Sequence, residues 1–283
     1  MPNYVPYIIL SLLSVLTFLY VMLHARNYGT VVLFLTFVGM IYLFEFIVLV
    51  LLDCYVYYPG FVKDPYLDSM IGAFQSNFLA VPVAGIVIVT FRLRYRWGVL
   101  FSLFFSGIEW LFLKLGVYEH YWWRTPYTTV SLLFFFWLVR YWSNKIAQGS
   151  RLLRYISLLF FSLSVLDTLI FFLMLFGFRR FHLGIYSNPV KDDVFLTFIF
   201  VVINALILAT VVYRTAAIRW IIAALAVMFA LHITLVRTGV IQLYISPWIY
   251  YSIYIPCCLL IAWLLVVTKH SLAAMRMHHH RIE

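Results

Sequence analysis

The stretch WGVLFSLFFSGIEWLFLKLGVY, residues 97–118, indicates the fold class of this chain. It is mostly apolar, with one carboxylate, Glu109, near its middle and one cation, Lys114, further along. A membrane-spanning helix needs about 20 consecutive, mostly apolar residues. The stretch therefore predicts a transmembrane helix with an ionisable side chain close to the centre of the bilayer.

The same pattern returns 123 positions later, in WIIAALAVMFALHITLVRTGVI, residues 220–241. Aligned without a gap, the two stretches match at four further positions: Glu109 with His232, Lys114 with Arg237, Gly116 with Gly239, and Val117 with Val240. Such a match over the length of a helix predicts an internal duplication.

The composition extends this interpretation to the whole chain. Hydrophobic residues make up 65% of the sequence and charged residues 11%, whereas soluble domains have roughly 45–50% and about 25%. No part of the chain is polar enough for a separate soluble domain. The formal charge of +10 comes mainly from residues between apolar stretches, which indicates contact with anionic headgroups and not with nucleic acid.

About nine stretches meet the length and polarity of a membrane span. They lie near residues 5–25, 30–56, 67–91, 97–118, 127–144, 155–178, 194–213, 218–241 and 248–269. Because a backbone exposed to lipid must satisfy its own hydrogen bonds, each is expected to be a helix. The predicted fold class is an all-α integral membrane protein.

The duplication divides these spans into two parallel four-helix repeats and an extra N-terminal helix. The predicted boundaries are 1–28 for the extra helix, 29–145 for the first repeat, 146–154 for a cytoplasmic linker, 155–270 for the second repeat and 271–283 for a cytoplasmic tail. An even number of spans in each repeat makes both copies point the same way. The recurrence of Val62-Lys63-Asp64 as Val190-Lys191-Asp192 supports the assignment.

The basic residues predict the orientation. With nine spans, 13 of the 20 Lys and Arg residues fall on the same side as the C-terminus. The positive-inside rule then predicts a multi-pass protein of the cell membrane with its N-terminus outside and its C-terminus in the cytoplasm. Arg179 and Arg180 would face outward and run against this rule.

Six polar residues are predicted to lie near the bilayer centre, in corresponding spans of the two repeats. They are Glu45, Asn77 and Glu109 in the first repeat and Asp167, Asn204 and His232 in the second. A charge at the centre of an inserted helix costs roughly 2.5–3.5 kcal/mol, so these side chains are expected to face the bundle interior. They are candidates for ligand binding or proton coupling, with His232 sharing a proton with Asp167 or Glu109; the alternative is that they act as interhelical glue.

Lys114 and Arg237 lie five residues beyond Glu109 and His232. At about 1.5 Å of rise per residue, that depth lets their side chains reach the outer interface. We expect them to do so, and the alternative is a role as counter-ions or as an anion gate.

Several residues carry a resemblance to a known family. Ser106-Gly107-Ile108-Glu109, Asn77 and the aromatic run Tyr121-Trp122-Trp123 are similar to segments of uncharacterised small polytopic membrane proteins of spore-forming Firmicutes, which are about half this length. The resemblance covers roughly residues 40–145 and, more faintly, the second repeat, where His232 replaces Glu109. It implies an integral membrane protein and no known activity.

Two functions follow from these features. The first is a small-solute or ion transporter with a midplane polar site between the two repeats; the alternative is a non-transporting subunit, a receptor or assembly partner. A third hypothesis, a lipid-modifying enzyme, has only Glu119 and His120 as acid–base candidates. No nucleotide, metal or catalytic motif occurs, so no cofactor and no metal are expected. The expected partners are the lipid bilayer, a small solute or ion, and a membrane protein or a second copy of the chain.

Overall fold

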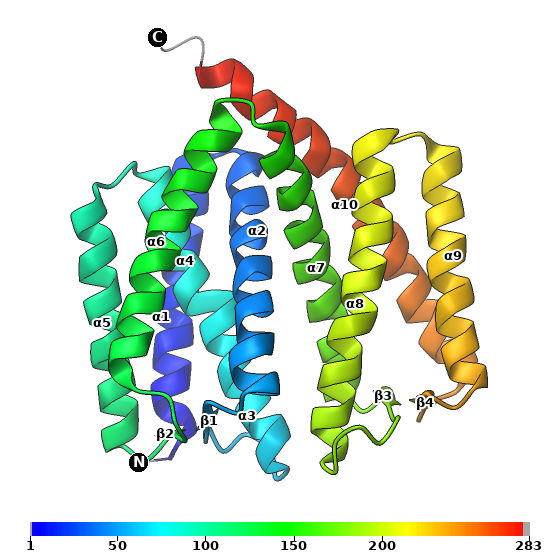
Figure 1. Cartoon of the computed structure of the whole chain (residues 1–283), viewed down its shortest axis with the longest axis horizontal. Helices are drawn as coiled ribbons and strands as arrows, with labels where there is room; N and C mark the ends of the chain where they lie inside the picture. The colour runs from blue at the N-terminus through cyan, green and yellow to red at the C-terminus, as the bar shows by residue number, and fades with distance from the viewer. Residues whose placement is uncertain (1, 280–283) are drawn as a thin grey trace. The chain divides into compact units, whose positions relative to one another are not determined.

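A computed structural model describes residues 2–279 of the chain (Figure 1). Within that range, eight helices are long and apolar enough to cross a membrane, as a multi-pass membrane protein requires. The chain divides into two compact units, Met1–Gln148 and Gly149–Glu283.

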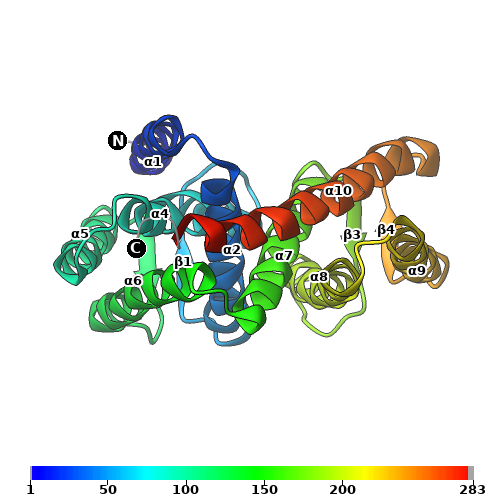
Figure 2. The same cartoon turned by 90° about the horizontal axis from the view of Figure 1, so that it is seen from above.

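The first unit contains the N-terminal helix and the elements of the first predicted repeat. In chain order it comprises α1 (Tyr4–Ala25), α2 (Tyr28–Glu45), the π-helix η1 (Phe46–Leu51), β1 (Tyr55–Tyr57), α3 (Pro65–Phe74), the π-helix η2 (Gln75–Ala80), α4 (Val81–Thr90), α5 (Tyr95–Lys114), β2 (Tyr118–His120) and α6 (Thr125–Ala147). Helix α5 lies beside α6, and α4 packs against α1, α2 and α6 (Figure 2). Helix α1 is thus an integral part of this unit.

The second unit has fewer interruptions in its helices. It comprises α7 (Arg151–Leu175), β3 (Arg179–Phe181), α8 (Pro189–Arg214), α9 (Ile218–Arg237), β4 (Ile241–Leu243) and α10 (Pro247–His279). Helix α8 packs against α7 and α9, and α10 packs against α7 and α8. The predicted tail, 271–283, is helical as far as His279, and residues 280–283 lie outside the described residues.

Each unit also contains a short antiparallel sheet, which corrects the expectation of a purely helical chain. Strand β1 pairs with β2, and β3 pairs with β4. Helices α5 and α9 end at left-handed glycines, Gly116 at φ +67° and Gly239 at φ +78°, as helix C-termini commonly do. Apolar residues continue past both glycines, so hydropathy extended the predicted spans 97–118 and 218–241 into the strands.

One predicted span, 127–144, corresponds to α6, which is 23 residues long but is not among the eight most apolar helices. Its polar residues lower its hydropathy, and Arg140, Asn144 and Lys145 are the most hydrophilic of them. Another predicted span, 30–56, ends too late, because the helical segment finishes at Leu51 and β1 follows.

A buried aspartate anchors the loop before α3 and the loop before α8. The Asp68 carboxylate accepts hydrogen bonds of 2.7–3.1 Å from the backbone N–H groups of Gly60, Phe61 and Val62. The Asp192 carboxylate accepts four, of 2.8–3.2 Å, from the backbone N–H groups of Leu183, Gly184, Ile185 and Tyr186. Buried backbone donors need such partners.

This arrangement changes one detail of the predicted repeat. Asp64 and Asn188 hold equivalent positions, since both accept hydrogen bonds from the first turn of the following helix. Asp192 therefore matches Asp68 and not Asp64. The similar residues Val62-Lys63-Asp64 and Val190-Lys191-Asp192 therefore do not occupy the same positions relative to the helices that follow.

We expect Asp192→Ala to destabilise the protein by about 2 kcal/mol or more, because it removes a carboxylate that satisfies several backbone donors. The expected readout is a lower Tm of the purified protein in detergent. Asp192→Asn keeps one acceptor oxygen and serves as the matched control, with a smaller loss. An unchanged Tm for Asp192→Ala would contradict this role.

Candidate functional site

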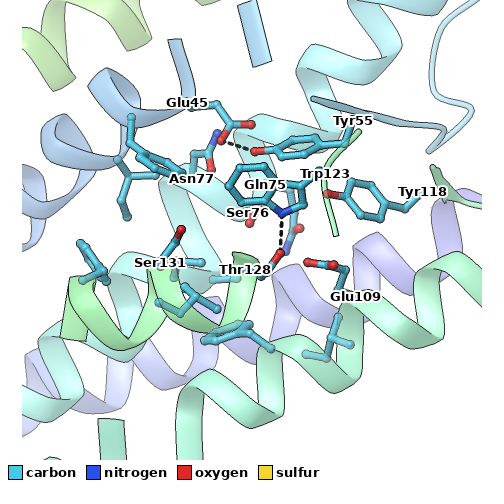
Figure 3. Close-up of a pocket in the computed structure, with 18 of the residues that line it drawn as sticks. Glu45, Tyr55, Gln75, Ser76, Asn77, Glu109, Tyr118, Trp123, Thr128 and Ser131 are labelled. Atoms are coloured by element: carbon cyan, nitrogen blue, oxygen red, sulfur yellow. Dashed lines mark hydrogen bonds between the residues drawn. The ribbon is translucent and has the colours of Figure 1, made fainter. Parts of the chain in front are cut away.

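The first unit encloses a cavity of about 500 Å³ (Figure 3). Pockets for small ligands are typically about 300–1,000 Å³. Its lining comes mainly from α2, β1, η2, α5, β2 and α6, and it includes Glu45, Asn77 and Glu109. The three polar residues predicted for the first repeat therefore share one site.

Two π-helical turns position the polar residues of this site. Glu45 is the last residue of α2, directly before η1, and Gln75, Ser76 and Asn77 open η2. A π-turn inserts an extra residue and occurs often at functional sites. Pro82, two residues after η2, has no N–H to continue a regular hydrogen-bond ladder.

Glu45 is a buried acidic group of the cavity, and one of its carboxylate oxygens has no hydrogen-bond partner among the described residues. Its side chain is 8% exposed. Its Oε2 accepts a hydrogen bond of 2.8 Å from the Tyr55 hydroxyl, while its Oε1 has no hydrogen-bond partner among the described residues. The Asn77 amide lies beside the carboxylate in Figure 3. Glu45 thus presents a free acceptor inside the cavity.

Gln75 presents the complementary group. Its side chain lines the same cavity and is 8% exposed. Its Nε2 is buried and has no hydrogen-bond partner among the described residues. A buried polar atom without a partner carries a desolvation cost of about 1–3 kcal/mol, which a bound molecule can relieve.

Glu109 is paired with a histidine, but not with the one predicted. Its Oε1 lies 2.9 Å from the Nε2 of His120, the last residue of β2. The neighbouring Glu119 is exposed and accepts a hydrogen bond of 2.9 Å from the Tyr58 hydroxyl. Glu119 and His120, the two acid–base candidates for a headgroup enzyme, thus have different partners.

Four aromatic residues, Tyr55, Tyr57, Tyr118 and Trp123, line the cavity and form what we call the aromatic wall. Their ring centroids are 4.8–5.8 Å apart in successive pairs. Burial, and then the charge of Glu45, raises the pKa of the Tyr55 hydroxyl well above its ordinary value. Tyr55 therefore stays a neutral hydrogen-bond donor.

Sequence reasoning missed the aromatic wall. Tyr and Trp near span ends usually belong to the interfacial belt, so the sequence positions of these residues favour that role over a ligand site. Three of the four residues enter the cavity because β1 and β2 pair antiparallel, with Tyr57 opposite Tyr118. A pairing between strands about 60 residues apart leaves no local signal.

The charged side chains that line the cavity are all acidic. Among the described residues that line it, Glu45 and Glu109 are acidic, and none is Lys, Arg or His. Val130 and Phe134 of α6 belong to the lining and are 65% and 60% exposed. The cavity therefore reaches the outer surface of α6, a surface that acyl chains would contact in a bilayer.

The second unit has a buried charged cluster built around Arg179, which is 2% exposed. Its guanidinium donates hydrogen bonds to the Asp193 carboxylate at 2.6 Å, to the Thr197 hydroxyl at 2.8 Å and to the Ile170 carbonyl at 3.1 Å. Asp167 interacts electrostatically with the same guanidinium. Arg179, which ran against the predicted orientation, is thus an internal ion-pair partner.

His232 is packed among tyrosines. Its Nε2 lies 3.1 Å from the Tyr250 hydroxyl and its Nδ1 lies 3.4 Å from the Tyr251 hydroxyl. The ring stacks on Tyr254 at 4.8 Å between centroids. These contacts replace the expected proton-sharing pair with Asp167 or Glu109.

Asn204, the third polar residue of the second predicted repeat, donates to a carbonyl of its own helix, that of Phe200, at 2.7 Å. Asn204 is 1% exposed, and its Oδ1 has no hydrogen-bond partner in the part of the chain that the structure describes.

Lys114 and Arg237 are the last residues of α5 and α9, and both are exposed. The Lys114 ammonium lies over the Trp110 ring, 4.8 Å from its centroid. Neither residue lines the cavity. Among the side chains that the structure describes, those of residues 2–275, no group of three or more His, Cys, Asp or Glu residues could hold a metal ion.

Comparisons of the chain with protein-family models, with curated proteins and with solved structures found no match. The resemblance to small polytopic membrane proteins of Firmicutes stays a prediction.

We expect Ser131→Cys, in a variant without the three native cysteines, to react with a small, neutral, membrane-permeant thiol reagent, because Ser131 lines the cavity. Ser162→Cys is the matched control, since Ser162 is fully buried in the second unit. Mass spectrometry of the intact protein measures the modification. Equal reactivity of the two cysteines would contradict an accessible cavity.

Proposed function

We propose that the protein is a membrane transporter that binds a small solute in the cavity of its first unit. The observation that carries this proposal is the incomplete pairing of Glu45 and Gln75 on one cavity wall. Intramembrane ionisable residues that face a cavity commonly mark substrate or ion pathways. A merely structural pair would have its partners supplied by the protein.

The proposal includes the finer architecture: nine spans, with the N-terminus outside and the C-terminus in the cytoplasm, and two parallel repeats derived by duplication. Hydrogen bonds between equivalent backbone groups support the duplication. Tyr58 N–H donates to the Val117 carbonyl, and His182 N–H donates to the Val240 carbonyl. Parallel repeats related by an axis along the membrane normal are known among transporters.

The alternative function is that of a non-transporting receptor or subunit. Such a protein would bind a solute but would not transport it. Uptake into proteoliposomes distinguishes the two functions. A suitable probe set contains protonated amines, zwitterionic amino acids, neutral sugars and inorganic cations, each measured against empty liposomes.

We expect uptake of at least one probe class, and a loss of about tenfold or more in Glu45→Gln and in Glu109→Gln. A hydrogen bond to a charged group contributes about 1.5–3 kcal/mol, and 1.4 kcal/mol is tenfold in affinity. Glu119→Gln is the matched control, because Glu119 lies outside the cavity lining, and it should leave uptake unchanged.

Two results would overturn the proposal. Uptake that is the same in Glu45→Gln, Glu109→Gln and the unmodified protein would remove the cavity from the pathway. Binding of a probe without uptake would identify the protein as a receptor or subunit.

A further inference from the structure

We infer that the solute of this cavity is an organic cation: a protonated amine carrying an apolar body. The inference rests on the proposed function and assigns a chemical class to the same site. Three independent features of the described residues lead to it.

The first feature is charge. The chain carries a formal charge of +10, yet the cavity lining contains two carboxylates and, among the described residues, no basic side chain. Glu109 is already paired with His120, which lies outside the lining, so Glu45 is the carboxylate that can receive a cation. The Glu45 Oε1 needs a hydrogen-bond donor, which a protonated amine supplies together with an opposite charge. Charge-assisted hydrogen bonds of this kind are roughly twice as strong as neutral ones.

The second feature is the aromatic wall. Faces of Tyr and Trp rings attract cations, and aromatic cages recognise ammonium groups. Tyr55 joins the wall to the carboxylate, because its hydroxyl bonds to Glu45 and its ring is 5.8 Å from that of Trp123. The remaining lining is mostly aliphatic and phenylalanine side chains, which suit an apolar body.

The third feature is the equivalent position in the second unit. Tyr55 is the first residue of β1, and Arg179 is the first residue of β3 in the other two-stranded sheet. Arg179 is an internal cation there, paired with Asp193 and lying 4.9 Å from the centroid of the Phe181 ring. The second unit thus contains its own combination of cation, carboxylate and ring, whereas among the described residues of the first unit no Lys, Arg or His lines the cavity beside Glu45 and the aromatic wall.

The exposed edge of the cavity suggests how such a molecule enters. Val130 and Phe134 lie both on the lining and on the outer surface of α6. An amine with an apolar body partitions into the membrane with its charge near the headgroups, so lateral entry between lipid and α6 fits this chemistry.

The test uses the full-length protein in nanodiscs and a matched pair of probes, 4-phenylbutylammonium and 4-phenylbutan-1-ol. Both offer a hydrogen-bond donor on the same apolar body, and only the first is charged. 4-Phenylbutyrate supplies the opposite charge. Calorimetric titration, with empty nanodiscs as the reference, gives the affinity of each.

We expect the ammonium to bind about tenfold or more tightly than the alcohol, and the butyrate to bind more weakly than both. Glu45→Gln should abolish the preference for the cation, while Glu119→Gln should keep it. Tyr55→Arg, which places a cation as Arg179 does in the second unit, should lose ammonium binding. The Tm of this variant is measured in parallel, and a cooperative unfolding transition shows that the variant is folded.

Equal or tighter binding of the alcohol would overturn the cationic class while leaving a solute site in place. Tighter binding of the butyrate would overturn it as well. If none of the three probes binds, both this inference and the proposed solute site fail. An unchanged preference in Glu45→Gln would show that Glu45 does not recognise the charge.

Discussion

A polar group enclosed by apolar helices must find a partner, and this constraint governs the structure of the chain. Asp68 and Asp192 satisfy this constraint for the loops that lead into α3 and α8. Each carboxylate accepts hydrogen bonds from several backbone N–H groups of its loop. Arg179 and Asp193 meet the constraint in part for each other in the second unit, where the Arg179 Nε and the Asp193 Oδ2 have no hydrogen-bond partner among the described residues. Only where these needs are satisfied can the loops fold back against the helices.

The cavity of the first unit departs from this rule. Glu45 and Gln75 are buried, yet one atom of each has no partner among the described residues. Incompletely paired groups of this kind cost stability and occur in native proteins mainly where a ligand, water or a reaction supplies the partner. The two π-turns beside them are a second local cost at the same place.

The two units solve the same packing problem in different ways. Each has a two-stranded sheet at the ends of its helices, held by an aspartate-anchored loop. In the first unit, aromatic residues of the strands border a cavity; in the second, Arg179 and Phe181 are the first and last residues of β3 and are buried.

The sequence alone determined the membrane class, the approximate position of each long helix and the helical segments that carry Glu45, Asn77 and Glu109. Those features depend on hydropathy and on helix rise, which are local properties. Only the tertiary structure decided the partners of Glu109 and His232, the short strands and the aromatic wall. These depend on contacts between segments far apart in the chain, such as β1 with β2. The π-turns likewise follow from packing against neighbouring helices, because helix hydrogen-bond geometry is not encoded by hydropathy.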